Sequence, residues 1–236
     1  MEVRVNKYLS SAGYCSRREA DRLIEAGRVT IDGQMALIGS KVLDGQTVCV
    51  DGSAVGIEEE MILLAFNKPV GIVCTTTDKQ GNNNIVDFIG YSKRIYPVGR
   101  LDKDSEGLIL MTNNGEIMDR ILRSANGHEK EYIVTVDRDI DDEFIKNMGN
   151  GIYLEELDRT TKACSVFKEG KRCFRIILTQ GLNRQIRRMC ESQGRNVVAL
   201  KRIRIMNILL GDLKPGEYRS VTEQEYKILK EQLNNE

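Results

Sequence analysis

Metal-ligand residues are scarce in this sequence. It contains one histidine, His128, and six cysteines, no two of which form a Cys-x-x-Cys pair. Because structural zinc sites gather four such ligands at short spacings, the composition argues against a zinc site. Scattered cysteines are typical of reduced thiols in a cytosolic protein, so we expect a cytoplasmic location and a packing role for each thiol.

Long apolar segments and cofactor motifs are missing as well. The first residues include no apolar stretch of the kind that a secretory signal needs, and no apolar run reaches the ~18 residues of a membrane span. The sequence has neither the Gly-x-x-x-x-Gly-Lys-Ser/Thr phosphate loop nor the Gly-x-Gly-x-x-Gly dinucleotide motif. We therefore expect no membrane contact, no bound metal and no nucleotide cofactor.

An excess of one charge is also absent, because 35 Lys and Arg residues balance 35 Asp and Glu residues. The charges are nevertheless segregated. Residues 172–204 hold nine basic residues and one acid, and residues 4–28 hold six basic residues and three acids. Local basic patches, rather than the charge of the whole chain, attract a phosphate backbone. A nucleic-acid partner and an ordinary solvated surface explain this pattern equally well.

The N-terminal part shows the pattern of a small αβ unit. Apolar residues spaced over 5–12 predict a first helix, and Ser16–Glu19 fits a capping box at the start of a second helix, which Gly27 would end. Val29–Ile31 alternates like a strand, and Asp32-Gly33 after it is a hairpin signal.

Three arginines lie within two turns of the second predicted helix. Arg17, Arg18 and Arg22 can present their guanidinium groups together to phosphates, which helix capping alone does not require. The residues around them are Asn6-Lys7-Tyr8-Leu9, Ser16-Arg17-Arg18-Glu19-Ala20, Leu23-Ile24, Gly27-Arg28-Val29 and Asp32-Gly33. In these residues the segment resembles the S4 RNA-binding domain, and the resemblance implies an RNA partner.

Residues 99–107 form a charged loop between two predicted strands, one ending at Val98 and the other over Leu108–Thr112. Such loops often display catalytic groups, and Leu101 can hold this one so that the Asp102 carboxylate faces a cleft. Composition alone favours an ordinary solvated turn.

Four short motifs follow one another along the chain. They are Lys68-Pro69-x-Gly71, Gly99-Arg100-Leu101-Asp102 with Ser105 and Gly107-Leu108, Lys130-Glu131-Tyr132-x-Val134, and Gly181-x-Asn183-Arg184-Gln185-Ile186-Arg187-Arg188-Met189. In this order they resemble motifs of the RsuA/RluB/RluE/RluF family of pseudouridine synthases, and with the S4 unit the likeness spans the whole chain. Residues 126–132 and 202–207 look most similar to the RluF branch, which modifies large-subunit ribosomal RNA. Ser105 departs from the threonine of many synthases but keeps the hydroxyl.

The resemblance implies an α+β protein. It places an S4 domain at residues 1–52, a linker at 53–60 and a synthase catalytic domain at 61–236, the last built on a mixed, mostly antiparallel sheet. Periodicity itself indicates many short strands and a few helices. We expect these helices at about 115–123, 141–148, 184–193 and 222–233.

The same resemblance implies catalytic roles. Pseudouridine formation breaks the N1–C1′ bond of uridine and rejoins the base through C5, without redox change. Asp102 would attack C1′ or abstract the 2′ proton of the ribose, two routes that the sequence does not distinguish. Arg187 would keep that carboxylate ionised. The Tyr132 ring would offer a flat face for the uracil and its hydroxyl a proton relay, while a buried core tyrosine is the plain alternative.

Other basic residues are expected to contact RNA. Arg100 would hold a phosphate or fill the space left by a flipped base, and an exposed salt bridge is its alternative. Lys68 is either a surface charge or a phosphate contact. On a helix Arg184, Arg187 and Arg188 would fall on one side, so that one pairs with the nucleophile while the others meet phosphates.

The main competing hypothesis is a non-catalytic S4-type RNA-binding or ribosome-assembly factor. Such a protein shares the basic patches but does not need Asp102, Tyr132 and Arg187 together. A metal-dependent nuclease or deaminase is a weaker hypothesis, because the ligand spacings are missing. The RluF likeness points to 23S ribosomal RNA, with a transfer-RNA anticodon uridine as a second candidate substrate, and we expect a monomer. Which uridine is modified stays open.

Overall fold

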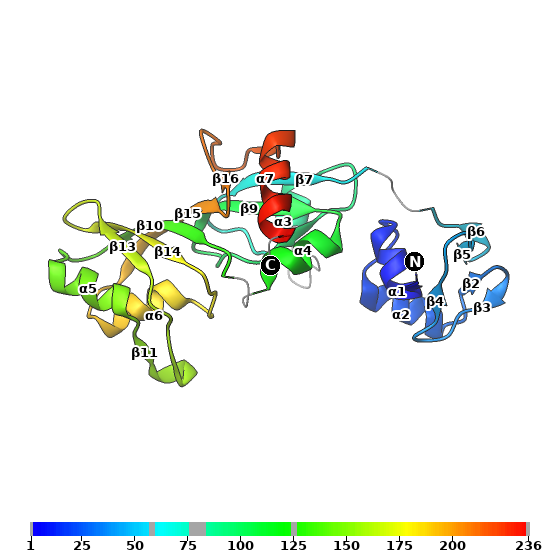
Figure 1. Ribbon diagram of the computed structural model, residues 1–236, viewed down its shortest axis with the longest axis horizontal. Coiled ribbons are helices and arrows are strands. Elements are labelled where there is room, and N and C mark those ends of the chain that lie inside the picture. Colours follow the sequence, from blue (N-terminus) through cyan, green and yellow to red (C-terminus); the bar gives the residue numbers. More distant parts are fainter. Residues whose placement is uncertain (1, 57–59, 76–83, 124–126, 235–236) are drawn as a thin grey trace. The chain divides into compact units, whose positions relative to one another are not determined.

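The computed structural model describes residues 2–56, 60–75, 84–123 and 127–234 (Figure 1). The chain divides into two compact units, and each is described by itself. One comprises Met1–Ile62 with Ser92–Arg94 and Asn113–Gly115, and the other comprises the rest. The middle of the predicted linker, residues 57–59, and Asn126 of the RluF-like segment lie outside the described residues. The domain boundaries at 52 and 61 therefore stay predictions.

The small unit contains two helices and two small sheets. Its elements are β1 (Val3–Arg4), α1 (Val5–Ser11), α2 (Arg17–Glu25), β2 (Val29–Ile31), β3 (Gln34–Met35), β4 (Lys41–Val42), β5 (Val48–Val50) and β6 (Ser53–Ala54). One sheet has the strand order β3-β2-β5-β6, and β1 pairs with β4 in the other. The apolar faces of α1 and α2, with Leu9, Ala20 and Leu23 buried, pack in one core with Val29 and Val48.

Local sequence signals explain how α2 begins and ends. The Ser16 hydroxyl accepts a hydrogen bond from the Glu19 amide at 3.2 Å, as the capping box predicts. The Glu19 carboxylate instead accepts from the Arg22 guanidinium at 3.0 Å. Gly27 lies after the helix with φ +68°, a conformation that favours glycine. Asp32-Gly33 has φ values of +50° and +80°, which fits the predicted hairpin turn.

The large unit is built on a nine-stranded sheet. Its strands are β7 (Leu63–Lys68), β8 (Tyr96–Val98), β9 (Glu106–Thr112), β10 (Lys130–Val136), β13 (Ser165–Lys168), β14 (Cys173–Leu178), β15 (Val197–Ile205), β16 (Ile208–Leu209) and β17 (Tyr218–Ser220). They follow the order β13-β14-β10-β15-β9-β7-β17, with β16 on β15 and β8 on β9. The β15–β9 pair is parallel and its neighbours are antiparallel, which confirms the predicted mixed, mostly antiparallel sheet of an α+β protein.

Helices and short connections complete the large unit. They are α3 (Ile85–Ile89), α4 (Gly115–Leu122), α5 (Asp142–Asn150), α6 (Gln185–Ser192), α7 (Glu223–Asn234), the 3₁₀ turn η2 (Glu155–Leu157) and the hairpin of β11 (Tyr153–Leu154) and β12 (Arg159–Thr160). The four predicted helices are present within about two residues at each end. The five-residue α3 was not predicted, because its start depends on a single cap: the Asn84 side chain accepts from the amides of Val86 and Asp87.

One apolar core lies between the sheet and helices α5 and α6. Val134 and Phe174 from β10 and β14 pack in it with Phe144 of α5 and Met189 of α6. This packing fixes α6 against the sheet and thereby positions the side chains that α6 directs toward the loop before β9. Within the described residues, no helix combines the length and apolar character needed to cross a bilayer.

Candidate active site

The loop that carries Asp102 is a fixed turn rather than a solvated one. Leu101 is buried, and its amide donates to the Sγ atom of Cys74 at 3.3 Å. The Ser105 amide donates to the Asp102 carbonyl at 3.1 Å, which closes the turn. The Asp102 side chain keeps 31% of its surface exposed. A nucleophile or base requires a backbone fixed by hydrogen bonds and a carboxylate that the substrate can reach, and the Asp102 loop provides both.

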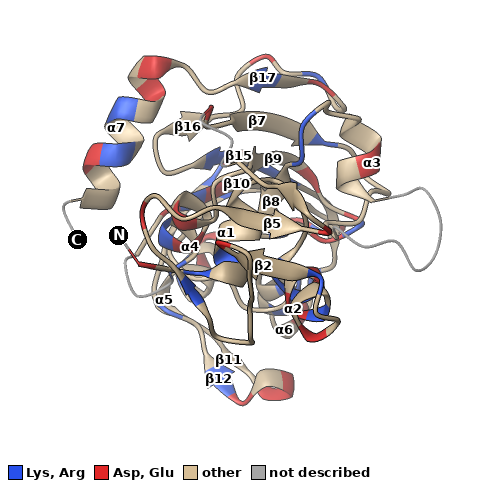
Figure 2. Cartoon of the chain, turned by 90° about the vertical axis from the view of Figure 1, so that its right-hand side faces the viewer, with Lys and Arg blue, Asp and Glu red and all other residues tan. Residues whose placement is uncertain are grey.

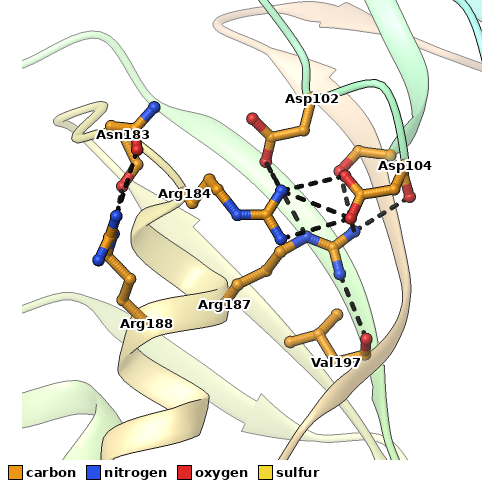
Figure 3. Close-up of polar contacts among 8 residues, drawn as sticks. Asp102, Asp104, Asn183, Arg184, Arg187, Arg188 and Val197 are labelled. Atoms are coloured by element: carbon orange, nitrogen blue, oxygen red, sulfur yellow. Dashed lines mark hydrogen bonds and ion pairs between the residues drawn. The ribbon is translucent and has the colours of Figure 1, made fainter.

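Arg187 is buried beside this carboxylate. Its side chain is 7% exposed, and its Nε atom lies 3.9 Å from Oδ2 of Asp102. The guanidinium also donates to the carbonyls of Asp104 at 3.0 Å and Val197 at 3.2 Å, and to the Ser105 hydroxyl at 3.3 Å. Figure 3 shows this guanidinium pointing from α6 toward the loop. These contacts fix a permanent positive charge next to Asp102.

Arg184 and Asp104 complete a group of alternating charges around Asp102. Arg184 Nη1 lies 3.9 Å from Asp102 Oδ2 and 3.4 Å from Asp104 Oδ1, and the Asp104 carboxylate is also 3.3 Å from Arg187 (Figure 3). Asp104 was not predicted as part of the site. Its signal in the sequence was weak, because an acid two residues after Asp102 in a charged loop is also typical of a solvated turn.

The predicted arrangement of the three arginines is wrong in one respect. Arg184 precedes α6 as its cap residue with φ +50°, so it does not lie on a helical face with Arg187 and Arg188. Arg188 turns to the carbonyl of Asn183 at 3.1 Å (Figure 3) and also pairs with the Glu156 carboxylate. Only Arg184 and Arg187 therefore meet at Asp102.

A row of cross-strand partners lies under the end of the Asp102 loop. Gly107 of β9 is opposite Lys68 of β7 on one side and Arg202 of β15 on the other, and Arg202 is opposite Tyr132 of β10. Directly opposed residues direct their side chains to the same face of a sheet. Lys68, Arg202 and Tyr132 therefore share one face, and α6 packs against the part of it that holds Tyr132. Gly107 has φ +111°, and a Cβ atom there would overlap the Arg202 backbone, so β9 needs glycine at this point.

Lys68 is enclosed at one end of this row. Its side chain is fully buried, and its ammonium donates to the carbonyls of Pro69 and Ile72, each at 2.8 Å. Burial lowers the pKa of Lys68 from its ordinary value. The predicted phosphate contact is therefore wrong: an ammonium sealed inside the turn that it stabilises cannot reach a phosphate.

Tyr132 and Arg202 occupy the other end of the row. Tyr132 is half-buried and packs against the core beneath α6. The guanidinium carbon of Arg202 lies 5.9 Å from the centre of the Tyr132 ring, and its Nε donates to the Leu108 carbonyl at 2.6 Å. Sequence reasoning missed Arg202, although its spacing was informative: on a strand Arg202 shares a face with the buried Leu200, whereas Lys201 lies on the opposite face.

Lys130 adds a third cation to this face, two residues before Tyr132 on β10. Its ammonium donates to the carbonyl of the buried His128 at 3.0 Å. Burial, helped by the charge of Arg202, lowers the pKa of Lys130 from 10.5 to about 8. The unfolded chain therefore binds more protons than the folded chain between pH 8 and 10.5, so the cost of burying this ammonium is complete below pH 8 and disappears as the pH rises.

We expect Lys130→Met to stabilise the protein at pH 7 by about 2 kcal/mol, because it removes this burial of charge. The advantage over the wild type should be largely gone at pH 10. Urea unfolding of both proteins at the two pH values measures the difference. Lys230→Met, on an exposed position of α7, is the control and should show no such change. A gain at pH 7 that persists unchanged at pH 10 would contradict the prediction.

The remaining predicted RNA contacts are exposed. Arg100 lies on the Asp102 loop, and Arg17, Arg18 and Arg22 lie on α2 of the small unit, where Figure 2 marks basic residues in blue. The described residues hold no group of three His, Cys, Asp or Glu side chains that could bind a metal ion. The site that they do form is a part-exposed carboxylate between the guanidinium groups of Arg184 and Arg187.

Comparisons with known proteins identify the family of this chain. The profile of a family described as RNA pseudouridylate synthase matches residues 62–192, and that of the S4 domain matches residues 3–49. The dual-specificity RNA pseudouridine synthase RluF of Salmonella typhi is 54% identical over 94% of this chain and 77% of its own length. The ribosomal large subunit pseudouridine synthase B of Vibrio cholerae is 36% identical over 91% of this chain and 70% of its own.

A solved structure extends the likeness to the fold. The crystal structure of a pseudouridylate synthase matches with a TM-score of 0.71 at 27% identity, and the alignment covers 96% of this chain and 99% of that one. The synthase profile includes the Asp102 loop and α6, which together form the site. The chain therefore belongs to the RNA pseudouridylate synthases, in the S4-containing group that includes RluB and RluF.

Proposed function

We propose that this protein isomerises a uridine of ribosomal RNA to pseudouridine, with Asp102 as the catalytic carboxylate. The observation that carries the proposal is the pairing of a part-exposed Asp102 with the buried Arg187, 3.9 Å away. A non-catalytic RNA-binding factor has no need to bury an arginine against the open carboxylate of a loop. Burying such a cation is costly unless it serves a partner.

Asp102 starts the reaction while ionised. It either attacks C1′ of the ribose or removes the 2′ proton, and in both routes the electron pair of the N1–C1′ bond leaves with the uracil. Arg187 and Arg184 stabilise the carboxylate without protonating it, because neither guanidinium can give up its proton at ordinary pH. The uracil then turns and C5 bonds to C1′. This step breaks the Asp102–C1′ bond in the first route, and in the second route the proton held by Asp102 returns to C2′. The proton of C5 is then lost and N1 gains one, which leaves neutral pseudouridine and an ionised Asp102.

The target base must leave its stack to reach Asp102, which costs a few kcal/mol. We propose that the exposed Arg100 stabilises the flipped state by contacting a phosphate or the vacated space. Arg184 and Arg188 then contact the flanking backbone, Arg188 after exchanging its carboxylate partner for a phosphate. Arg17, Arg18 and Arg22 of the S4 domain supply a second point of contact, which raises the local RNA concentration at the site.

The relatives' names guide the choice of substrate. One is a dual-specificity RNA pseudouridine synthase and another acts on the large ribosomal subunit. We propose 23S ribosomal RNA as the main substrate and a transfer-RNA anticodon uridine as the second, acted on in the cytoplasm by a monomer. Purified protein is incubated with transcripts of 23S, 16S and transfer RNA, with EDTA present, and pseudouridine is measured by nucleoside analysis. Conversion in 23S RNA supports the proposal, and no conversion in any transcript contradicts it.

Tyr132 tests the proposed platform for the base. We expect Tyr132→Leu to lower the single-turnover rate by about 10²-fold, because an aliphatic side chain loses the flat stacking surface. Tyr132→Phe keeps that surface and removes only the hydroxyl. If the hydroxyl relays a proton, the rate of the phenylalanine variant falls at least about 10-fold. If Tyr132 is a core residue only, both variants lose stability and neither slows the reaction in the folded protein.

A further inference from the structure

Arg202 is a buried cation to which the proposed mechanism gives no task. The residue is 3% exposed, and no carboxylate pairs with it in the described part of the chain. Its Nε donates to the Leu108 carbonyl, whereas its Nη2 atom is buried and has no hydrogen-bond partner among the described residues. A buried charged donor without a partner is costly, and such a group is typical of a site that a ligand completes.

We propose that Arg202 binds the uracil anion released when the N1–C1′ bond breaks, and so stabilises the leaving group of the reaction. The inference rests on the proposed function. When the bond breaks, its electron pair passes to N1 and spreads over the O2 and O4 carbonyls of the base. The negative charge stays on the base until C5 bonds to C1′, when Asp102 regains it by leaving C1′ or by returning its proton to C2′. Both routes open to Asp102 release the same anion, so the proposal does not depend on which one operates.

The position of Arg202 suits this task. It lies opposite Tyr132, whose ring is the proposed base platform, and opposite Gly107, five residues after Asp102. Gly107 approaches the Arg202 backbone so closely that no Cβ atom fits between them, which brings the end of the Asp102 loop against β15 at this residue. Arg202 therefore lies in the row between the end of the Asp102 loop and the tyrosine.

Charge on the same face supports the assignment. Lys130 lies two residues before Tyr132 on that strand, and the positive charge of Arg202 contributes to the lowering of its pKa. Lys68 stands at the other end of the row, and Arg202 contributes to the lowering of its pKa as well. Arg202 therefore repels both lysines. An anionic base placed among them would relieve that repulsion, and preorganised donors aimed at a developing anion are a large source of catalysis.

A phosphate fits this position less well than a base. Arg100 and Arg184 are exposed at the mouth of the site and can reach a backbone phosphate, whereas Arg202 is almost fully buried in the sheet. Its Nη2 atom is buried as well, and the guanidinium carbon lies 5.9 Å from the centre of the Tyr132 ring, so a group that meets this guanidinium must enter the site as deeply as the ring. The flipped uracil is the part of the substrate that enters so deeply.

Leaving-group chemistry separates this role from a structural one. The fluorine of 5-fluorouridine stabilises the N1 anion of its base, so bond cleavage depends less on an external cation. We expect Arg202→Met to slow the single-turnover conversion of uridine by about 10²-fold to 10³-fold. The disappearance of 5-fluorouridine from the same RNA should slow at least about 10-fold less, and the Kd for RNA should stay the same. Arg202→Lys keeps the charge but loses the forked donors. It should also slow uridine more than 5-fluorouridine, but by a smaller factor than Arg202→Met.

Arg204→Met is the matched control. Arg204 lies on the same strand but on the opposite face, where its guanidinium pairs with Glu131 and Glu129. The Arg204→Met variant should slow the conversion of both substrates by the same factor, or should not slow either. Equal slowing of both substrates in the Arg202 variants would overturn the proposal, and so would a loss of RNA affinity, which would indicate a phosphate contact. If Arg202→Met does not fold, the rates of Arg202→Lys with the two substrates test the proposal instead. Wild-type protein that converts neither substrate would refute the proposed function itself.

Discussion

Replacing Asp102 by asparagine is expected to lower pseudouridine formation by at least about 10⁴-fold. The amide has nearly the shape of the carboxylate but carries no charge, so it can neither attack C1′ nor accept the 2′ proton. RNA affinity should stay within about 3-fold of the wild type, because the basic residues proposed to contact RNA are unchanged. Single-turnover conversion and RNA binding are measured on the same preparation.

Asp104→Asn provides the matched control. Asp104 contacts the same two arginines as Asp102, at 3.4 Å from Arg184 and 3.3 Å from Arg187, and lies in the same loop. If it only positions these arginines, its loss should slow the reaction by about 10-fold, far less than the loss of the Asp102 carboxylate. Activity that survives in Asp102→Asn but disappears in Asp104→Asn would show that the two roles are assigned to the wrong residues.

Replacing Arg187 by methionine is expected to damage both activity and stability. The change removes donors to the Asp104 and Val197 carbonyls and to the Ser105 hydroxyl, and it leaves Asp102 without its buried cation. We expect a rate loss of about 10³-fold and a decrease of about 3 kcal/mol in the free energy of unfolding. Single-turnover kinetics and urea unfolding measure the two effects.

Two further variants separate these effects. Arg187→Lys keeps the charge, but one ammonium cannot reach every acceptor that the guanidinium meets, so stability and rate should both fall between those of the wild type and of Arg187→Met. Arg188→Met, on the same helix, removes an arginine bonded to Asn183 and Glu156 and should change the free energy of unfolding by less than about 1 kcal/mol. If Arg187→Met unfolds at the same urea concentration as the wild type and reacts at the same single-turnover rate, Arg187 contributes to neither stability nor catalysis.

Local signals predicted much of the fold. The Ser16 cap, the glycine after α2 and the Asp32-Gly33 turn each act within a few residues, and the structure has all three. The four long helices and the mixed sheet were also expected. The short α3 was not, because a five-residue helix has no periodicity to detect and depends on the Asn84 cap.

The site was predicted less completely, because its geometry depends on cross-strand register. Asp102 and Arg187 were expected to meet, and they do at 3.9 Å. The burial of Lys68 follows from the turn that its ammonium closes, which a short motif does not reveal. Asp104 and Arg202 join the site only because α6 packs against the sheet and because Arg202 of β15 lies opposite Gly107. No local pattern in the sequence specifies either contact.

The central claim is that this chain makes pseudouridine in ribosomal RNA through Asp102. The most direct test maps pseudouridines in 23S ribosomal RNA by carbodiimide-stop sequencing, in cells without the gene and in the same cells supplied with wild-type or Asp102→Asn protein. We predict that at least one site disappears without the gene, returns with the wild type and stays absent with the variant at equal protein level. A map that does not change when the gene is removed, or a site that Asp102→Asn restores, would contradict the claim.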